Sequence, residues 1–333
     1  MKKENNVKRY FWLWIIMIFL VELSENMQGR GGPILPNGET NRIAVTFDDL
    51  PLNIAAYVSD AEMDSIVSRL LAKIQQEHIP VVAFVNEIKL EVGGVRDPDR
   101  IRILKKWLDA GFELGNHTYS HVSANTVPVS VFESDIIKGE RTIKELLAAQ
   151  GKKPLWFRHP FLHVGRRISA RDSIDNFLKQ HGYRVAPVTI DNGEWIFSAA
   201  FDKAFSRGDT AAMHRWGKSY IEYMHRKLKY WEGFSQRLFG RNIQHVLLIH
   251  SNRLNSFYFH DLCRMIRSEG YSFISLDSAL QDPAYQTPDT YTGGWGISWL
   301  DHWAMTQQKP KSFYADEPRV PQEILDYTGI ESE

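Results

Sequence analysis

The stretch IAVTFDD, residues 43–49, begins with apolar and β-branched residues and ends with two adjacent aspartates. A short apolar run of this kind predicts a buried strand over residues 43–47. Ionisable side chains are rarely buried without a partner, so Asp48 and Asp49 mark the point where the chain leaves the core. The first element of the fold is therefore predicted to bring two carboxylates to one end of a strand.

Six more apolar runs predict strands along the chain, at residues 81–86, 112–116, 155–158, 183–188, 246–250 and 271–275. Amphipathic stretches between them predict helices at residues 62–77, 99–110, 131–150, 171–180 and 257–268. Strands that alternate with helices predict parallel pairing through right-handed crossovers. Seven such units favour an α/β fold that closes into a seven-stranded (β/α) barrel over a six-stranded open sheet.

Composition excludes several classes of protein. The chain has 333 residues, 43% hydrophobic and 24% charged, which is unlike a disordered, collagen-like or coiled-coil protein. Forty Lys and Arg residues balance 40 Asp and Glu residues, so no excess charge indicates a nucleic-acid partner. The single cysteine, Cys263, excludes an internal disulfide, and its apolar helical surroundings predict a buried thiol and not a nucleophile.

Polar residues follow five of the predicted strands. They occur in Asp48-Asp49, in HTYSH at residues 117–121, in RHPF at 158–161, in DNGEW at 191–195 and at His250. In a parallel barrel the carboxyl ends of all strands share one face. These side chains, distant in sequence, are therefore predicted to converge.

Two of the histidines have the spacing and context of metal ligands. His117 and His121 follow a strand and would approach one cation from a single turn, together with one aspartate. Two imidazoles and one carboxylate leave coordination positions open, as a catalytic metal requires, whereas a second aspartate could serve as a general base. The alternative is that Asp48 and Asp49 form a solvated turn or a helix cap. A second pair, His159 and His163, is less suited because Pro160 lies between them.

The five motifs together resemble the polysaccharide deacetylase family, also known as the NodB-homology domain or carbohydrate esterase family 4. The motifs are TFDD at residues 46–49, HTYSH at 117–121, FRHPF at 157–161, DNGEW at 191–195 and LLIH at 247–250. The resemblance covers about residues 42–280. It implies a distorted (β/α) barrel of the NodB-homology type. It also implies metal-dependent removal of acetyl groups, usually from N-acetylglucosamine units of a chitin-like or peptidoglycan-like glycan.

The resemblance assigns a role to each matched residue. Asp48 would be the general base, oriented by Arg158, and His250 the general acid, paired with Asp191. One divalent metal would be held by Asp49, His117 and His121, with zinc as the default and cobalt, nickel or iron(II) as alternatives. Substrate binding would fall to Pro160, Phe161 and Trp195, with a backbone N–H near Phe161 facing the oxyanion. The alternative for Trp195 is a place in the wall of the core.

The third motif departs from the family pattern, which commonly has a second proline and a tyrosine-glycine pair at this position. This chain has RHPFL at residues 158–162 instead. We therefore expect a reshaped oxyanion loop and sugar subsite.

The regions outside the motifs define the predicted domain organisation. Residues 1–27 place four basic residues before an uncharged apolar run at 10–21, which predicts a signal peptide or a retained signal anchor. Residues 28–41 are predicted as a linker, and residues 42–283 as the catalytic domain. The protein is accordingly expected to be exported to the periplasm, the cell envelope or the medium, with a membrane tether if the apolar segment is kept.

Two further segments do not follow the alternation of strands and helices. Residues 197–242, rich in aromatic and basic residues, predict an inserted helical pair before the sixth strand, acting as a lid or as an oligomer contact. Residues 284–333 predict a C-terminal extension packed on the barrel. Its aromatic stretch GGWGISWLDHW, residues 293–303, either packs on the barrel or stacks on sugar rings.

Three other functions compete with the glycan deacetylase. A catalytically silent carbohydrate-binding protein could use the same fold. A deacetylase could also act on a smaller amide or ester. A glycosidase is poorly supported, because its two carboxylates must flank the scissile bond, whereas Asp48 and Asp49 are adjacent on one strand end.

Overall fold

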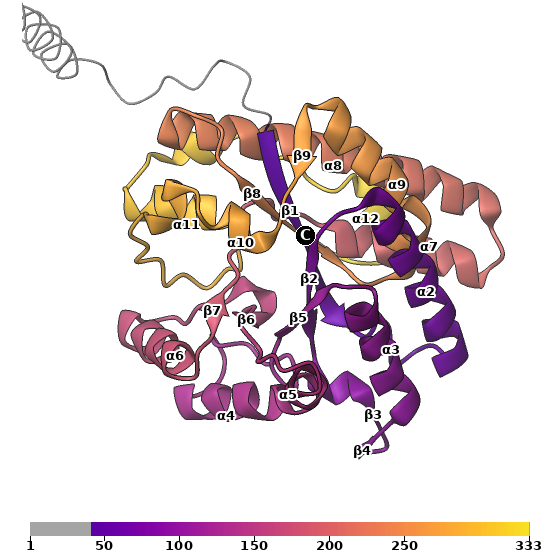
Figure 1. Ribbon diagram of the computed structural model, residues 1–333. Coiled ribbons are helices and arrows are strands. Elements are labelled where there is room, and N and C mark those ends of the chain that lie inside the picture. Colours follow the sequence, from indigo (N-terminus) through magenta and orange to yellow (C-terminus); the bar gives the residue numbers. More distant parts are fainter. Residues whose placement is uncertain (1–40, 333) are drawn as a thin grey trace, which may run out of the picture. The chain divides into compact units, whose positions relative to one another are not determined.

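The computed structural model describes residues 41–332, which are drawn in colour in Figure 1. The predicted signal segment, residues 1–27, and the predicted linker up to residue 40 lie outside the described residues. Within residues 41–332, no helix is both long enough and apolar enough to cross a membrane.

A single parallel sheet forms the centre of the fold (Figure 1). Its strand order is β7-β6-β5-β2-β1-β8, and β9 pairs with the beginning of β1. The seven strands are β1 (Asn41–Leu50), β2 (Val81–Val85), β5 (Glu113–Asn116), β6 (Trp156–Phe157), β7 (Arg184–Val185), β8 (His245–His250) and β9 (Tyr271–Phe273). Each corresponds to one predicted apolar run, so the seven-stranded parallel arrangement is confirmed.

The segment after β7 closes the sheet. β7 pairs with β6 at one edge, and five residues later Ile190 forms a parallel bridge to Leu247 of β8 at the other edge. The N–H groups of Thr189 and Ile190 both donate to the carbonyl oxygen of Val246, at 3.0 Å. One stretch of chain thus joins the two edges, which gives the predicted distorted (β/α) barrel.

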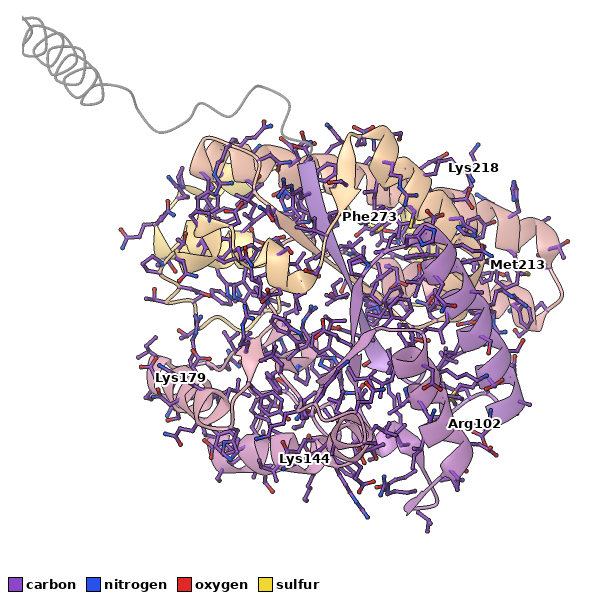
Figure 2. The ribbon with its side chains drawn as sticks, in the orientation of Figure 1. Arg102, Lys144, Lys179, Met213, Lys218 and Phe273 are labelled. Atoms are coloured by element: carbon purple, nitrogen blue, oxygen red, sulfur yellow. The ribbon has the colours of Figure 1, made fainter. Side chains whose placement is uncertain are left out.

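Helices cover the outside of the barrel at nearly all the predicted positions. The predicted helices appear as α2 (Asp60–Glu77), α3 (Pro98–Asp109), α6 (Ile168–Gln180) and α9 (Arg253–Ser268). The first two begin at side-chain caps, since Ser59 Oγ accepts from the N–H of Glu62 and Asp97 Oδ1 from that of Asp99. Charged side chains of the helices, including Arg102, Lys144, Lys179 and Lys218, are exposed to solvent (Figure 2).

The single helix predicted over residues 131–150 is wrong. The chain forms two helices instead, α4 (Val129–Gly139) and α5 (Arg141–Ala148). The carbonyl of Asp135, which would pair with the N–H of Gly139 inside a regular helix, accepts from the N–H of Tyr119 at 3.0 Å. A Cβ at Gly139 would lie 2.4 Å from the backbone of Thr118, so α4 ends directly against the loop that carries His117 and His121.

A short hairpin also escaped the prediction. It follows the helical turn η1 (Glu87–Leu90) and consists of β3 (Glu91–Val92) and β4 (Val95–Arg96). Gly93 and Gly94 join the two strands with φ angles of 60° and 78°. Two successive glycines between valines are typical of such a turn, and this signal was present in the sequence.

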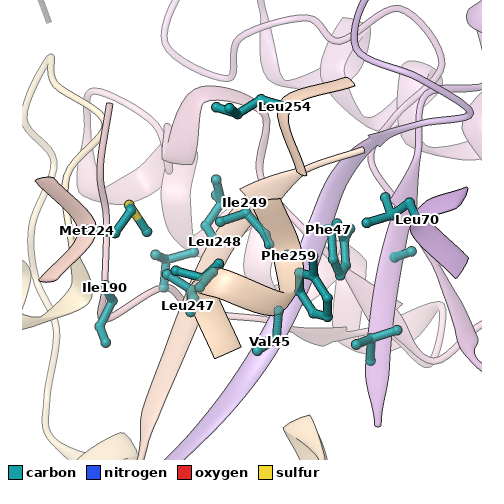
Figure 3. Packing of buried hydrophobic residues seen from close by; sticks show 14 of the residues in the cluster. Val45, Phe47, Leu70, Ile190, Met224, Leu247, Leu248, Ile249, Leu254 and Phe259 are labelled. Atoms are coloured by element: carbon teal, nitrogen blue, oxygen red, sulfur yellow. The ribbon is translucent and has the colours of Figure 1, made fainter. Parts of the chain in front are cut away.

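The main core lies between the barrel and the helices that cover it. Figure 3 shows Val45 and Phe47 of β1 near Phe259 of α9, with Leu247 of β8 beside them. The rings of Phe47 and Phe259 are tilted, with centroids 5.7 Å apart, and both side chains are fully buried. Burial of each such side chain contributes about 1.5–3 kcal/mol, so this packing fixes β1 and the carboxylates at its end.

The predicted helical pair before the sixth strand is present as α7 (Glu194–Ser206) and α8 (Thr210–Phe239). The C-terminal region packs on it, with α11 (Trp299–Thr306) against α8 and α12 (Gln322–Thr328) against α7. The remaining short elements are α10 (Leu276–Ala279), η2 (Pro160–Leu162), η3 (Pro283–Gln286) and η4 (Lys311–Tyr314). Buried Trp303 and Ile324 join this region to the main core.

Candidate active site

The predicted convergence of the strand ends is found in the structure. A cavity of about 950 Å³ opens at the carboxyl ends of the strands. Eight of the predicted site residues line it, namely Asp48, Asp49, His117, His121, Phe161, Asp191, Trp195 and His250. The two others, Arg158 and Pro160, are buried and do not line the cavity.

Asp49, His117 and His121 form a candidate metal site. One ligand atom of each lies within 4.8 Å of the other two, and among residues 41–332 no other such group of His, Cys, Asp or Glu is found. Asp49 Oδ1 is 3.6 Å from His121 Nε2 and 3.9 Å from His117 Nε2. Ligand atoms about 2.0–2.1 Å from a tetrahedral metal are about 3.3 Å apart, so the three ligand atoms would move closer together when a cation binds.

The imidazole of His117 is oriented for this role. Its Nδ1 is 2.8 Å from the carbonyl oxygen of Arg158. A carbonyl oxygen can only accept, so Nδ1 carries the proton and the lone pair of Nε2 faces the aspartates. Burial lowers the pKa of His117 to about 4, and burial together with His117 lowers the pKa of His121 to about 3. Both rings are therefore neutral near pH 7, as metal ligands must be.

The carboxylate of Asp49 also fits a cation. Burial alone would raise its pKa, but Lys89 and His121 lower the pKa below its ordinary value, so the group is ionised. Lys89 Nζ is 3.1 Å from Oδ2, whereas the buried Oδ1 has no hydrogen-bond partner. A buried carboxylate oxygen without a donor is costly unless a cation compensates it. Lys89, which follows β2 in η1, was not among the predicted site residues.

Asp48 lies beside this group and is paired with Arg158. Arg158 Nη1 is 3.5 Å from Asp48 Oδ2, and Nη2 donates to Thr46 Oγ1 at 2.9 Å. Both side chains are buried, with exposed fractions of 0% for Arg158 and 3% for Asp48. Burial raises the pKa of Asp48 above its ordinary value despite the lowering effect of Arg158. A carboxylate with a raised pKa accepts a proton more readily than an exposed one.

His250 pairs with a residue that was not among the predicted site residues. Its Nδ1 is 2.7 Å from Oε2 of Glu194, so Glu194 takes the part that was assigned to Asp191. Glu194 is the first residue of α7, and its longer side chain reaches from there to the end of β8. The carboxylate of Asp191 instead accepts from the N–H of Asn192 at 2.8 Å, and its carbonyl accepts from Trp231 Nε1 at 2.9 Å.

Glu194 is buried and held by further donors. Its Oε1 accepts from the side-chain amides of Asn252 and Asn255. Burial alone would lower the pKa of His250, but the hydrogen bond and charge of Glu194 raise the pKa to about 9. The imidazole is thus protonated near pH 7. One signal in the sequence could have indicated Glu194. Its carboxylate stands just before the apolar residues of the predicted helical pair.

The third-motif loop forms another wall of the cavity. Phe161 is 53% exposed, and its ring meets that of His121 edge-on with centroids 4.3 Å apart. The second histidine pair lies apart from the metal group. His159 stacks on the Phe132 ring, and His163 Nδ1 is 2.7 Å from Ser123 Oγ.

Unfavourable backbone conformations concentrate around the cavity. Among residues 41–332, eight non-glycine residues have positive φ, and five of them belong to this region. Those five are Asp49, Thr118, His121, Phe161 and Leu162. Each such residue costs about 1–3 kcal/mol, and strain of this kind clusters at active sites and ligand clamps. The packing around the cavity therefore maintains a geometry that the local chain would not adopt alone.

Comparisons with known proteins agree with the motifs. Residues 36–186 match the sequence model of a family described as polysaccharide deacetylase. A peptidoglycan-N-acetylglucosamine deacetylase from Bacillus cereus is 26% identical over 150 residues, which are 45% of this chain and 57% of that protein. A second such protein from Bacillus cereus is 25% identical over 156 residues, 46% of each chain. The chain therefore spans about half the length of these curated relatives.

Among solved structures, a polysaccharide deacetylase from Bacillus cereus is similar, with a TM-score of 0.48 and 17% identity over 71% of this chain and 91% of that one. The family match ends at residue 186, before the fourth and fifth motifs. The cavity nevertheless joins the first two motifs to Asp191, Trp195 and His250. Residues 36–186 of this chain, a little under half of its length, therefore match the polysaccharide deacetylase family.

Proposed function

We propose that this protein is a metal-dependent hydrolase that removes acetyl groups from N-acetylated glycans, with N-acetylglucosamine units of a chitin-like or peptidoglycan-like chain as substrate. The observation that carries the proposal is one cavity lined by the ligand group Asp49, His117 and His121 together with Asp48 and His250. These are a candidate cation site, a base and an acid, which together supply the parts of a metal-assisted amide hydrolysis.

Asp49, His117 and His121 would hold the cation, zinc by coordination preference, with cobalt, nickel or iron(II) as alternatives. The cation would supply Lewis acidity toward the acetyl carbonyl. Asp48, held by Arg158, takes a proton from the attacking water, whose oxygen forms the new bond to the carbonyl carbon. A backbone N–H near Phe161 donates to the oxyanion.

His250 completes the reaction. The carbon–nitrogen bond breaks as the amine leaves, and the imidazolium of His250 gives it a proton, so that the products are acetate and a free amino sugar. The raised pKa of His250, about 9, keeps this acid protonated at neutral pH. Asp191 lines the same cavity, and its negative charge acts on Arg158.

The substrate class rests on the relatives and on the lining of the cavity. Both curated relatives are named for peptidoglycan N-acetylglucosamine. Phe161 and Trp195, 53% and 43% exposed, offer aromatic surface to a sugar ring. Such a glycan lies outside the cytoplasm, which agrees with the export predicted from residues 1–27. The exported protein would be either secreted or tethered to a membrane.

Acetate release from a panel of acetylated substrates tests the proposal. Chitin oligomers, peptidoglycan fragments and a small acetyl ester are incubated with the full-length protein before chelation, after chelation, and after addition of Zn²⁺. We expect acetate without new reducing ends, a loss of at least about 100-fold on chelation, and recovery with the metal. New reducing ends without acetate, or acetate release that chelation leaves unchanged, would contradict the proposed function.

A further inference from the structure

A segment of the C-terminal extension forms part of the cavity wall. We define residues 291–297 as the C-terminal strap. Three of its residues, Trp295, Gly296 and Ile297, line the same cavity as Asp48 and His250. The strap lies outside residues 36–186, so the family match assigns it no role.

The backbone of the strap is fixed on both sides of Trp295. The hydroxyl of Tyr291 donates to the carbonyl of Trp295 at 2.9 Å and accepts from its N–H at 3.3 Å. The carbonyl of Tyr291 in turn accepts from buried Arg171 at 2.8 Å. Further along, the N–H of Trp299 donates to the carbonyl of Val188 at 2.7 Å. The strap is thus tied to the body of the barrel before and after Trp295.

Gly296 brings the strap into direct contact with the third-motif loop. A Cβ at this position would lie 1.6 Å from the carbonyl oxygen of Phe161. No side chain fits there, so the close approach requires glycine. Trp295 is therefore held immediately beside the loop whose N–H groups we propose for the oxyanion.

The side chain of Trp295 is not used for packing. It is 79% exposed, whereas Trp299 and Trp303 of the same aromatic stretch are 7% and 2% exposed. The two buried rings anchor the extension, as one of the sequence-based alternatives predicted. The backbone that carries this exposed indole is already fixed in the cavity wall. Little conformational entropy is therefore lost when the indole binds a flat apolar surface.

The cavity has room for more than the acetylated unit. At about 950 Å³ it lies at the upper end of the range for small-molecule sites, roughly 300–1,000 Å³. Phe161 and Trp195 face the same space with half-exposed rings. Three aromatic residues from three separate segments fit a pyranose chain, whose rings each present an apolar C–H face.

We propose that Trp295 is a substrate-binding residue whose indole stacks on a sugar ring adjacent to the N-acetylated unit that reacts. This rests on the proposed function and extends it from one acetylated sugar to an oligosaccharide of at least two units. The aromatic stretch therefore serves both purposes considered from the sequence, with Trp299 and Trp303 in packing and Trp295 in sugar binding.

Oligosaccharide binding to Trp295 variants tests this inference. The dissociation constant of the β-1,4-linked N-acetylglucosamine tetramer is measured by calorimetry on the full chain, and hydrolysis of p-nitrophenyl acetate is measured in parallel. Trp295→Ala should raise the dissociation constant about tenfold, whereas Tyr57→Ala should leave both the dissociation constant and hydrolysis of the small ester within about twofold of the unaltered protein. Trp295→Phe should restore most of the affinity. Tyr57→Ala is the matched control, because Tyr57 is 87% exposed and does not line the cavity.

The outcomes separate the two proposals. If Trp295→Ala binds the tetramer as tightly as the unaltered protein while the tetramer still loses acetate, the stacking role is overturned and the proposed function stands. If the unaltered protein neither binds the tetramer nor releases acetate from any glycan, both are overturned. Thermal unfolding of each variant within a few degrees of the unaltered protein excludes a folding defect as the cause.

Discussion

Asp48→Asn lowers kcat for acetate release by about 10²–10⁴-fold, the range expected when a general base is removed. The amide has the shape of the carboxylate but cannot take the proton of the attacking water. Asp49, His117 and His121 are unchanged, so the variant should still bind one cation. Initial rates of acetate release at saturating glycan, with the zinc content of each preparation measured alongside, check this result.

Loss of the charge at Asp48 also leaves Arg158 without its carboxylate, and both side chains are buried. Removing one partner of a buried ion pair can cost about 3–5 kcal/mol, so urea unfolding must accompany the kinetics. The bond from Arg158 to Thr46 remains and should keep the variant folded. A folded, zinc-loaded Asp48→Asn protein with the kcat of the unaltered chain would exclude Asp48 as the base.

Glu194→Gln moves the alkaline limb of the pH profile of kcat/KM toward lower pH. The acid His250 must be protonated to act, and Glu194 raises its pKa to about 9, so activity should persist up to about that pH and then fall. Glutamine removes the negative charge. Burial then dominates and lowers the pKa of His250, so the acid loses its proton at a lower pH and the largest loss of rate appears above pH 8.

Two further variants serve as comparisons for Glu194→Gln. His250→Ala should lower kcat by about 10²–10⁴-fold at every pH, because no acid remains to protonate the amine. Asp191→Asn is the matched comparison, since Asp191 is the partner that the motif assigned to His250. A limb that shifts in Asp191→Asn and stays in place in Glu194→Gln would contradict the pairing in the structure.

The barrel could be predicted from the sequence because its signals are local. Each strand is a short apolar run, and alternation with amphipathic helices fixes parallel pairing without knowledge of distant contacts. The prediction of one helix over residues 131–150 was wrong because the break in it depends on a contact that is distant in sequence. Its interruption depends on the N–H of Tyr119, which takes the Asp135 carbonyl from outside the helix. No periodicity within the helix reports such a contact.

The candidate site likewise contains residues that could be predicted from the sequence and residues that could not. Residues directly at strand ends, such as Asp48, His117 and His250, meet because the topology brings them together. Glu194 and Lys89 act through the reach of long side chains from a helix and a turn, and sequence spacing does not encode that reach. Trp295 joins the site only through the tertiary position of the C-terminal strap, which Gly296 makes possible.

Zinc titration by calorimetry tests the central claim most directly, namely that Asp49, His117 and His121 bind one catalytic cation. The chelated full-length protein should bind one Zn²⁺ per chain at this site, and Asp48→Asn should bind it as well. His121→Ala should bind it at least about 100-fold more weakly, a larger loss than the 10- to 100-fold typical of residues that only support a ligand. Equally tight binding of one Zn²⁺ by His121→Ala would contradict the account.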